Sequence, residues 1–470
     1  MDLLGRLRHL VGRDALLTAP GDTAAYLTDH RHLFQGAALA VVQPASTAEV
    51  SRLLAWCNET GIGVVPQGGN TGYCGGATPD ASGQQIVLTL HRMNQIRSVD
   101  APGYSLVAEA GCTLAAVQAA ADAVDRLFPL SLGSEGSCQI GGNLATNAGG
   151  TAVLRYGMMR DLTLGIEVVL ADGSVVSGLS PLRKDNTGYD LTNLMIGSEG
   201  SLGVITAACL RIFPRTRSVA TAWVSVPAPG SAVALLGRLR DGSGDRLASC
   251  ELIPRAALEL VVAQVPGARD PGTAAAPWYL LVELTSSIVE DVDAMLEQLL
   301  GAAIENGEAI DAALARSVDQ RLDFWRLRES VPEAQRRAGA SLKHDVCVPV
   351  AAVPELIERG AGIAAQLVPD GFLVAYGHAG DGNLHFNVSQ RPGTDPAAFR
   401  SREPSLKRAI HDLVASMGGS FSAEHGIGQL KVEELERYAP PAELAAMRRI
   451  KQALDPNGIL NPGKVLRTTT

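Results

Sequence analysis

The spacing of hydrophobic and polar residues divides the chain into two parts with different predicted architectures. In the first part, the apolar runs AALAVV and IGVVP flank residues 47–61, where apolar positions recur with a helical period. This order predicts a strand, a helix and a strand. A later run, GIEVVLADGSVVSG, places Asp172 and Gly173 between two apolar stretches, which predicts a hairpin. The first part therefore mixes helices with many strands.

From about residue 217, apolar strands alternate with longer helical stretches, which predicts an α+β domain with one antiparallel sheet. Pro214 and the polar residues after it mark a boundary. The tail from about residue 440 has the pattern of an amphipathic helix that stops at Pro456. We therefore expect domains over residues 1–216 and 217–425, and a helical segment over residues 426–470 that packs back on the first domain.

Composition and charge place the chain among folded proteins and limit its partners. Of its 470 residues, 46% are hydrophobic and 19% are charged, and the formal net charge is -9. The sequence has no basic run, which argues against nucleic acid as a partner. Its longest apolar runs fall far short of the roughly 20 residues of a transmembrane helix, and its first residues lack the apolar core of a signal peptide. We expect a cytoplasmic protein with its seven cysteines reduced. A homodimer is the candidate assembly, and the sequence leaves the oligomeric state open.

Three segments of the first part are rich in glycine: PQGGNTGYCGG at 66–76, LGSEGSCQIGGNLATNAGG at 132–150 and NTGYDLTNLMIGSEGSLG at 186–203. Glycine lets the backbone approach a ligand and aims amide hydrogens at anionic oxygens. No GxGxxG spacing is present. The nearest match to a phosphate loop, GILNPGKV, ends with Val465 at the position where a hydroxyl residue is required, so no true phosphate loop is present either. Surface turns use glycine equally well. The residues alone leave two interpretations open: turns, or a site for an extended cofactor with phosphates.

In the second part, two histidines and a carboxylate stand in a predicted hairpin and a predicted loop. AYGHAGDGNLHFN puts His378 and His385 at the ends of the hairpin, and GGSFSAEHGIG offers Glu424 between glycines. Two imidazoles and a carboxylate suit a catalytic divalent-metal site with open positions. Histidines bonded across a hairpin, beside an unrelated acidic loop, are the alternative that the residues leave open.

Residues 324–345 form a charged stretch that contains Arg328 and Lys343. Arginine binds carboxylates through two parallel hydrogen bonds, and lysine adds a point charge. The residues alone favour a simpler interpretation, a helix whose charged face is exposed to solvent.

The motifs PQGGNTGYCGG, GGNLATNAGG, RYGMMRD, NTGYDL and GSEGSLGVIT resemble the signature of the flavin-binding domain of the vanillyl-alcohol oxidase and p-cresol methylhydroxylase family. Within that family the chain is most similar to the D-2-hydroxyacid dehydrogenases, and the resemblance runs from about residue 20 to residue 465. It implies a two-part FAD-binding domain, an α+β substrate domain and oxidation of a D-2-hydroxyacid of the D-2-hydroxyglutarate, D-lactate or D-malate class. Electrons would pass to a separate acceptor such as an electron-transfer flavoprotein, a quinone or a cytochrome.

The resemblance implies that the glycine-rich segments hold FAD, with its diphosphate on the loop over residues 68–72. Some relatives attach FAD through a histidine where this chain has Asn70, so we expect non-covalent FAD; Cys138 is a less excluded attachment point. The expected cofactor-binding residues are Pro66, Gly68, Gly69, Asn70, Thr71, Gly72, Ser131, Gly133, Ser134, Cys138, Gly141, Gly142, Thr146, Asn147, Gly149, Gly150, Glu199, Gly203, Ile205 and Asn461.

The resemblance also gives roles to the polar residues of the second part. It implies that a divalent metal, which we expect to be zinc, is bound by His378, His385 and Glu424. It implies that the substrate is bound by Arg328, Lys343 and Asn387.

His425, adjacent to a predicted metal ligand, is the expected general base and is also expected to contact the substrate, because a neutral imidazole suits proton transfer near pH 7. The chain departs from the family at Pro332, where relatives often carry a hydroxyl residue that helps to hold substrate, and at His344, where they often have tyrosine. These departures leave the identity of the hydroxyacid open. Two other functions use the same residues: a metal-dependent hydrolase that binds a nucleotide substrate, and a non-catalytic flavin carrier that docks a partner protein.

Overall fold

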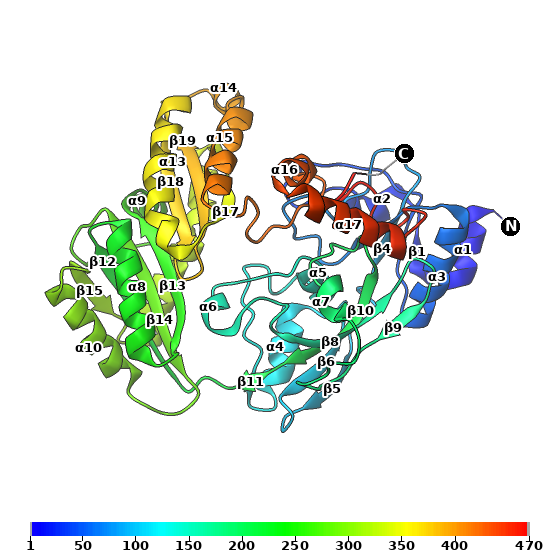
Figure 1. The fold of residues 1–470 in the computed structure, drawn as a ribbon, viewed down its shortest axis with the longest axis horizontal. Coiled ribbons are helices and arrows are strands. Elements are labelled where there is room, and N and C mark those ends of the chain that lie inside the picture. The colour runs from blue at the N-terminus through cyan, green and yellow to red at the C-terminus, as the bar shows by residue number, and fades with distance from the viewer. Residues whose placement is uncertain (1, 468–470) are drawn as a thin grey trace. The chain divides into compact units, whose positions relative to one another are not determined.

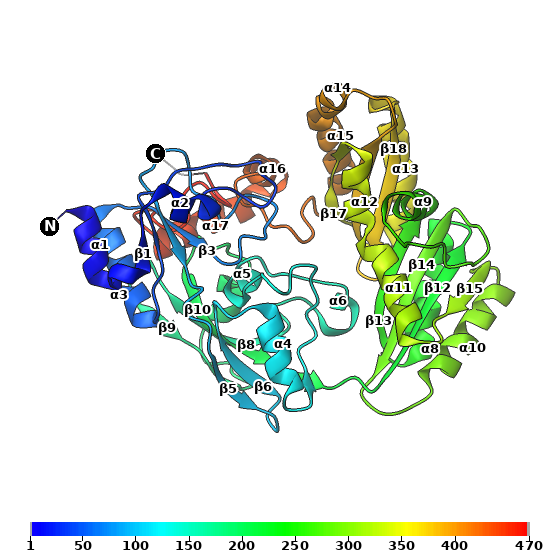
Figure 2. The same ribbon diagram turned by 180° about the vertical axis from the view of Figure 1, so that it is seen from behind.

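The computed structural model describes residues 2–467; residue 1 and residues 468–470, at the ends of the expected ranges, lie outside the described residues. The chain forms two compact units, seen from opposite sides in Figures 1 and 2. The first unit comprises Met1–Gly150, Gly157–Arg215 and Glu424–Thr470, and the second comprises Thr151–Tyr156 and Thr216–Ala423.

The units differ from the expected domains at three places. Residues 151–156 and Thr216, expected in the first domain, belong to the second unit. Residues 424–425, expected in the second domain, belong to the first unit. The helix α6 (Val153–Tyr156) packs on β13 (Leu247–Pro254), and the hydroxyl of Ser249 donates a hydrogen bond to the carbonyl of Thr151 at 2.7 Å. Such contacts join residues far apart in the chain, so the local pattern carries no sign of them.

A four-stranded sheet with the order β1-β2-β4-β3 lies in the first unit. β2 (Ala40–Val42), α3 (Thr47–Thr60) and β3 (Val64–Gln67) confirm the predicted strand, helix and strand. β4 (Ile86–Thr89) lies between β2 and β3 and runs parallel to both, an order that the sequence pattern did not predict.

The helix α3 forms where its sequence provides a cap at each end and one apolar face. The hydroxyl of Ser46 accepts a hydrogen bond from the amide of Glu49, and Gly61 ends the helix with a φ of 70°. The buried residues recur at helical spacing, so this face packs against the sheet. They are Val50, Leu53, Leu54 and Cys57.

A second, antiparallel sheet of the first unit has the order β5-β6-β10-β8-β9. Its strands are β5 (Ile96–Asp100), β6 (Ser105–Glu109), β8 (Thr163–Val169), β9 (Val175–Ser177) and β10 (Val204–Arg211). The predicted hairpin is the β8–β9 connection, where Gly173 has a φ of 84° and the amide of Ser174 donates to Asp172.

Shorter elements complete the first unit. They are α1 (Leu3–Val11), β1 (Leu16–Leu17), α2 (Pro20–Thr23), α4 (Leu114–Asp122), β7 (Arg126–Leu127), α5 (Ile140–Ala145), α7 (Leu191–Met195), β11 (Phe213–Pro214), α16 (Val432–Tyr438) and α17 (Pro441–Leu454), with 3₁₀ turns η1 (Arg13–Ala15) and η2 (Ala24–Tyr26). The last helix, α17, is the amphipathic helix that the C-terminal pattern predicted.

The second unit is built on one eight-stranded antiparallel sheet. Seven strands follow the order β15-β12-β14-β13-β18-β19-β16, and β17 also pairs with β19. The strands are β12 (Ser218–Val226), β13, β14 (Trp278–Ser286), β15 (Asp311–Leu314), β16 (Ser341–Leu342), β17 (Asp345–Cys347), β18 (Gly371–His378) and β19 (Asn383–Gln390). The helices are α8 (Pro229–Ser243), α9 (Arg255–Gln264), α10 (Val292–Glu305), α11 (Val318–Glu329), α12 (Val331–Ala338), η3 (Val350–Ala352), α13 (Val353–Leu367), α14 (Pro396–Arg400) and α15 (Glu403–Ser416).

Helices cover both faces of this sheet because successive side chains of each strand point to opposite faces. In β14, Leu280 and Val282 face the core formed with α8, α10, α13 and α15, which lies toward the viewer in Figure 1. Tyr279 and Leu281 face the core formed with α9, α11 and α12, seen in Figure 2. The predicted α+β fold class, with one antiparallel sheet in the second domain, is confirmed.

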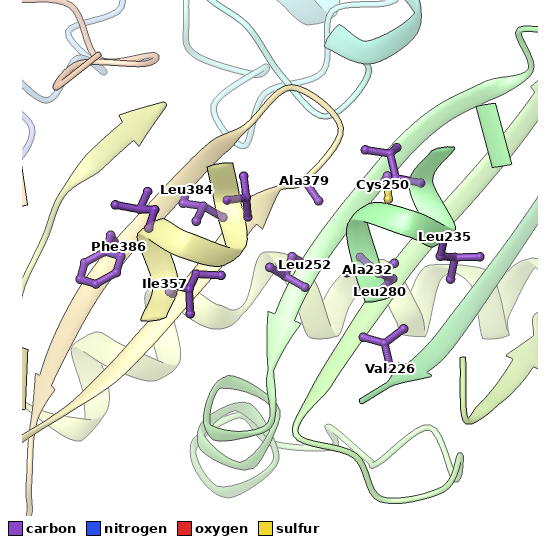
Figure 3. Close-up of a cluster of buried hydrophobic side chains, with 14 of the residues drawn as sticks. Val226, Ala232, Leu235, Cys250, Leu252, Leu280, Ile357, Ala379, Leu384 and Phe386 are labelled. Atoms are coloured by element: carbon purple, nitrogen blue, oxygen red, sulfur yellow. The ribbon is translucent and has the colours of Figure 1, made fainter. Parts of the chain in front are cut away.

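Figure 3 shows part of the first of these cores, where Leu252 of β13 and Phe386 of β19 lie beneath the helices. At Gly360, α13 comes so close to the sheet that a Cβ atom would lie 2.5 Å from the Phe386 ring. Each fully buried Leu side chain in such a core contributes about 1.5–3 kcal/mol to stability. Among residues 2–467, no helix combines the length and the apolar character needed to cross a bilayer.

Candidate functional site

A cavity that is partly open to solvent lies in the first unit and is lined by all three glycine-rich segments. The empty space within it, counting the open solvent at its mouth, is about 1000 Å³. The predicted cofactor residues that line it are Pro66, Gly68, Gly69, Asn70, Thr71, Gly72, Gly141, Gly142, Thr146, Glu199, Gly203 and Ile205. His425, the predicted general base, lines the same cavity.

The glycines of the cavity serve two different purposes. A Cβ atom on Gly69 would lie 2.0 Å from the carbonyl oxygen of Ser137, so glycine is needed there for the first loop to pack against the second segment. A Cβ on Gly72 or Gly142 would meet nothing within 4 Å. Larger residues at those two positions would occupy space that a ligand needs.

The polar groups of the cavity fit an extended polar ligand. Within the described residues, the buried side-chain oxygen Oε1 of Gln139 has no hydrogen-bond partner, and Gln139 lines the cavity. A buried amide oxygen without a partner costs about 1–3 kcal/mol, which a ligand's hydroxyl or amide donor would offset. An acceptor oxygen in this place suits the hydroxyl and ring N–H donors of FAD.

Asn70 holds the first glycine-rich loop in place. Its backbone has a φ of 52°, a conformation that asparagine tolerates better than most residues. Its side-chain amide donates hydrogen bonds to the carbonyl of Thr28 at 2.8 Å and to that of Ala25 at 3.3 Å. The loop is therefore anchored to the preceding helical segment by the residue that stands where some relatives attach FAD.

Eight predicted cofactor residues are absent from the cavity lining: Ser131, Gly133, Ser134, Cys138, Asn147, Gly149, Gly150 and Asn461. Those whose contacts are described support the lining instead. A Cβ on Gly150 would lie 2.0 Å from the carbonyl of Ser131, and the side-chain amide of Asn461 donates to the carbonyls of Gly76 and Glu199. The Cys138 thiol is buried and accepts a hydrogen bond from Asn143.

The loop that follows His425 packs directly on the first glycine-rich loop. The backbone amides of Ile427 and Gly428 each donate a hydrogen bond of 2.7 Å to the carboxylate of Glu199. Burial raises the pKa of Glu199, and the two amide hydrogen bonds oppose that effect. Gly428 has a φ of 53°, and a Cβ there would lie 2.1 Å from the Cys74 carbonyl, so only glycine fits.

Sequence reasoning missed residues that complete the cavity. Tyr73 lines it and places its ring 4.7 Å from the His425 ring. The apolar residues Leu88, Leu90 and Ala110 line it as well. Tyr73 belongs to the glycine-rich segment 66–76, so the sequence could have indicated its place in the cavity. The three apolar residues have the pattern of ordinary buried strands, which gives no sign of a ligand site.

Lys464, in the segment that comes nearest to a phosphate loop, does not line this cavity within the described chain. Its side chain is only 3% exposed. Burial lowers the pKa of Lys464 to about 8, although Asp80 opposes the shift. None of the seven cysteines, all within residues 2–467, forms a disulfide.

The second unit gathers polar side chains at one end of the face covered by α9, α11 and α12. His378 and Tyr376 are two residues apart on β18, and His385 of β19 pairs with Tyr376, so all three point to this face. The rings of His378 and His385 lie 5.8 Å apart, edge to face, and the Tyr376 ring lies 5.0 Å from that of His385. The hairpin therefore brings the two predicted histidine ligands together.

Glu251 of β13 is directly opposite His378 in the sheet, and sequence reasoning did not identify it. Its carboxylate is 2.7 Å from His378 Nδ1 and 2.7 Å from Arg328 Nε. Burial alone would raise the pKa of Glu251, but His378 and Arg328 lower it to about 2. Glu251 thus joins a predicted metal ligand to a predicted substrate-binding residue.

The predicted substrate residues have different environments. The Arg328 side chain, on α11, is buried with its guanidinium over the Tyr376 ring at 5.0 Å, not on a solvent-exposed face. Asn387 is buried, and its side chain contacts the amide of His344 at 3.3 Å and the side chain of Gln335 at 2.9 Å. Lys343 is exposed.

The two departures from the family pattern occupy different surroundings. Pro332 is exposed in the first turn of α12, a position where proline is tolerated. His344 is buried, with its ring 5.8 Å from that of His411. Glu424 is the first residue of the C-terminal segment of the first unit and follows Ala423 directly.

Family comparisons identify the class of this fold. The model "FAD binding domain" matches residues 38–178, and "FAD linked oxidases, C-terminal domain" matches residues 215–465. The structure of p-cresol methylhydroxylase with substrate bound superposes with a TM-score of 0.77, covering 99% of this chain and 96% of that chain at 17% identity. The architecture is thus the two-domain FAD-binding fold found in p-cresol methylhydroxylase.

Sequence relatives narrow the assignment. The mitochondrial D-2-hydroxyglutarate dehydrogenase of Arabidopsis thaliana is 38% identical over 99% of this chain and 80% of that protein. The mitochondrial D-2-hydroxyglutarate dehydrogenase of Bos taurus is 38% identical over 99% of this chain and 84% of that protein. The chain belongs to the D-2-hydroxyglutarate dehydrogenase family of FAD-linked oxidases.

Proposed function

We propose that this protein is an FAD-dependent dehydrogenase that oxidises a D-2-hydroxyacid to the 2-oxoacid. The observation that carries this proposal is the cavity of the first unit, in which the glycine-rich segments and His425 line the same space. The family relationship supports it, because both relatives described above are named D-2-hydroxyglutarate dehydrogenases.

FAD would be held by the loop at Gly68–Gly72, by Gly141 and Gly142, and by the unpartnered amide oxygen of Gln139. When bound, it supplies the hydride acceptor for the C2 hydrogen of the substrate. We propose non-covalent binding, because Asn70 offers no nucleophile and its amide is engaged with Thr28. Acid precipitation should therefore release the flavin into the supernatant; flavin that stays with the pellet would contradict this.

We propose that His378, His385 and Glu424 hold a divalent metal, with zinc as the first choice. Two imidazoles and one carboxylate are a donor set found in catalytic zinc sites. The amide of Ala423 donates to the carbonyl of Asp345 at 3.4 Å, and Asp345 pairs with His385 in the sheet. Because consecutive Cα atoms are about 3.8 Å apart, the backbone of Glu424 stays near that strand. The bound metal would favour ionisation of the substrate hydroxyl.

The remaining steps fall to side chains of this chain. His425 would take the hydroxyl proton, as an imidazole can near neutral pH. Arg328 and Lys343 would bind the substrate carboxylates and so hold C2 in a fixed orientation. Transfer of the C2 hydrogen is fast only when the reacting atoms are held in such a geometry. Asn387 would contact the substrate, and its hydrogen bond to Gln335 would keep its own side chain in place.

The substrate class extends over D-2-hydroxyglutarate, D-lactate and D-malate. Pro332 cannot donate a hydrogen bond, so we expect weaker selection for the distal carboxylate of 2-hydroxyglutarate than a hydroxyl residue would give. Activity with an artificial electron acceptor should be compared across the three acids for wild type and Pro332→Ser. A lower KM for D-2-hydroxyglutarate alone in the variant supports this role; equal changes for all three acids contradict it.

The electron acceptor, assembly and location complete the proposal. We propose an electron-transfer flavoprotein, a quinone or a cytochrome as acceptor, and a homodimer as the candidate assembly in solution. The expected cytoplasmic location stays a prediction for cell fractionation, since the plant and bovine relatives are named as mitochondrial.

A purified protein without flavin absorption would point to the nucleotide-binding hydrolase instead. A flavin that none of the three acids reduces would point to an electron carrier.

A further inference from the structure

One buried carboxylate links the two halves of the proposed substrate site. Glu251 is 1% exposed and lies near the middle of the eight-stranded sheet, between strands β14 and β18. An ionised carboxylate in such a place is strongly unfavourable unless its oxygens accept hydrogen bonds or ion pairs. Here Oε1 contacts His378 and Oε2 contacts Arg328, each at 2.7 Å. Each oxygen of the carboxylate therefore has its own partner, and both contacts exist at the same time.

The first contact fixes the His378 ring. An ionised carboxylate can only accept hydrogen bonds, so Nδ1 must carry the hydrogen that points at Glu251. The lone pair of the neutral ring is then on Nε2, on the far side of the imidazole. A carboxylate behind a metal-bound histidine sets the tautomer and the ring orientation in this way, and its loss typically weakens metal binding 10- to 100-fold.

The second contact fixes the Arg328 guanidinium. Nε donates to Glu251, while the planar group lies over the Tyr376 ring at 5.0 Å. Together these contacts restrict the position and the orientation of the guanidinium. Arginine recognises carboxylates through such a fixed planar geometry. The orientation with which Arg328 meets a substrate carboxylate therefore depends on Glu251.

We propose that Glu251 is a positioning residue that aligns the metal-ligating nitrogen of His378 and the substrate-binding guanidinium of Arg328 at the same time. This inference rests on the proposed function, because it assumes that His378 binds a metal and Arg328 a substrate carboxylate. Its consequence is that removing one carboxylate weakens two separate interactions.

The test uses full-length protein with FAD, in wild-type form and as Glu251→Gln. Glutamine keeps the size of the side chain, but its NH2 group is a donor and cannot accept a hydrogen bond from His378 or Arg328. Only the contact at the remaining oxygen therefore survives. We expect the zinc dissociation constant, measured by competition with a chromogenic chelator, to rise about 10- to 100-fold. The KM for the hydroxyacid at saturating zinc should rise about tenfold or more, because the arginine is no longer oriented.

A matched control separates positioning from loss of stability. Glu308→Gln removes the carboxylate from the Arg238–Glu308 pair, which has hydrogen bonds of 2.6 and 2.8 Å in the same unit but no proposed role. It should leave zinc affinity and KM unchanged. Should Glu251→Gln fail to fold, Glu251→Asp keeps the charge but cannot reach both partners, and the same changes are expected.

The outcomes separate this inference from the proposed function. A Glu251 variant that melts earlier but keeps wild-type zinc affinity and KM would reduce Glu251 to a structural residue and overturn the inference. A wild-type protein that binds no zinc, or whose flavin no hydroxyacid reduces, would overturn the proposed function and the inference with it.

Discussion

The carboxylate of Glu199 accepts a hydrogen bond from the backbone amide of Gly428 at 2.7 Å, and a second of the same length from Ile427. Glu199 belongs to the third glycine-rich segment, and the two amides follow His425 in the chain. One side chain therefore ties the loop with the proposed general base to the proposed FAD cavity. This connection lies entirely within the first unit.

Replacing Glu199 by alanine should free that loop. Two amides would lose their acceptor, at a cost of about 1–3 kcal/mol each if they stay buried. We expect a lower melting temperature, and flavin reduction by substrate slowed about tenfold because His425 is no longer held. Glu109→Ala, which breaks an ion pair with Arg97 and changes a residue that does not itself line the cavity, is the control. An unchanged rate of flavin reduction in Glu199→Ala would show that this loop does not position the proposed general base.

Replacing His425 by alanine should remove the general base and leave FAD bound. Stopped-flow reduction of the flavin should slow by on the order of a hundredfold or more, the usual size of such a contribution. His9→Ala changes an exposed histidine in α1 and should behave as wild type. Reduction of His425→Ala at the wild-type rate would remove this residue from the mechanism.

Removing the metal should abolish flavin reduction without releasing the flavin. The cavity residues proposed to hold FAD all belong to the first unit, and none of them is a proposed metal ligand. After exhaustive chelation, we expect full flavin absorption, no bleaching by substrate and recovery on addition of zinc. Equal bleaching before and after chelation would refute the metal assignment.

Replacing Lys464 by methionine should stabilise the protein near neutral pH. Burial lowers the pKa of Lys464 from 10.5 to about 8, so its charged form is less favourable in the folded than in the unfolded chain. Below about pH 8 this costs on the order of 1–3 kcal/mol, and wild type recovers the difference as the pH rises toward about 10.5. The gain of Lys464→Met in free energy of unfolding should therefore shrink with rising pH. A gain that stays constant would contradict this.

The sequence predicted which segments line the cavity and many of the lining residues, but it could not separate them from residues that only support the lining. Gly72 and Gly142 border open space, whereas Gly150 packs against the backbone of Ser131. Glycine produces the same local pattern in both situations, because a close backbone contact and a ligand both exclude a Cβ atom. Only the three-dimensional packing separates the two groups.

Glu251 illustrates a second limit. Its sequence surroundings, ASCELIP, describe an ordinary buried strand. Its partners Arg328 and His378 lie 77 and 127 residues away, and the register of β13 with β18 alone places it opposite the histidine. The hairpin with His378 and His385 was predictable because its turn residues are adjacent in the chain. The carboxylate behind it was not, since sheet order depends on long-range pairing.

Anaerobic mixing of the purified protein with D-2-hydroxyglutarate, followed at the flavin absorption band, tests the central claim most directly. We predict full bleaching with one equivalent of 2-oxoacid formed per flavin, and no bleaching with the L enantiomer. A flavin that stays oxidised with D-2-hydroxyglutarate, D-lactate and D-malate alike would contradict the proposed activity.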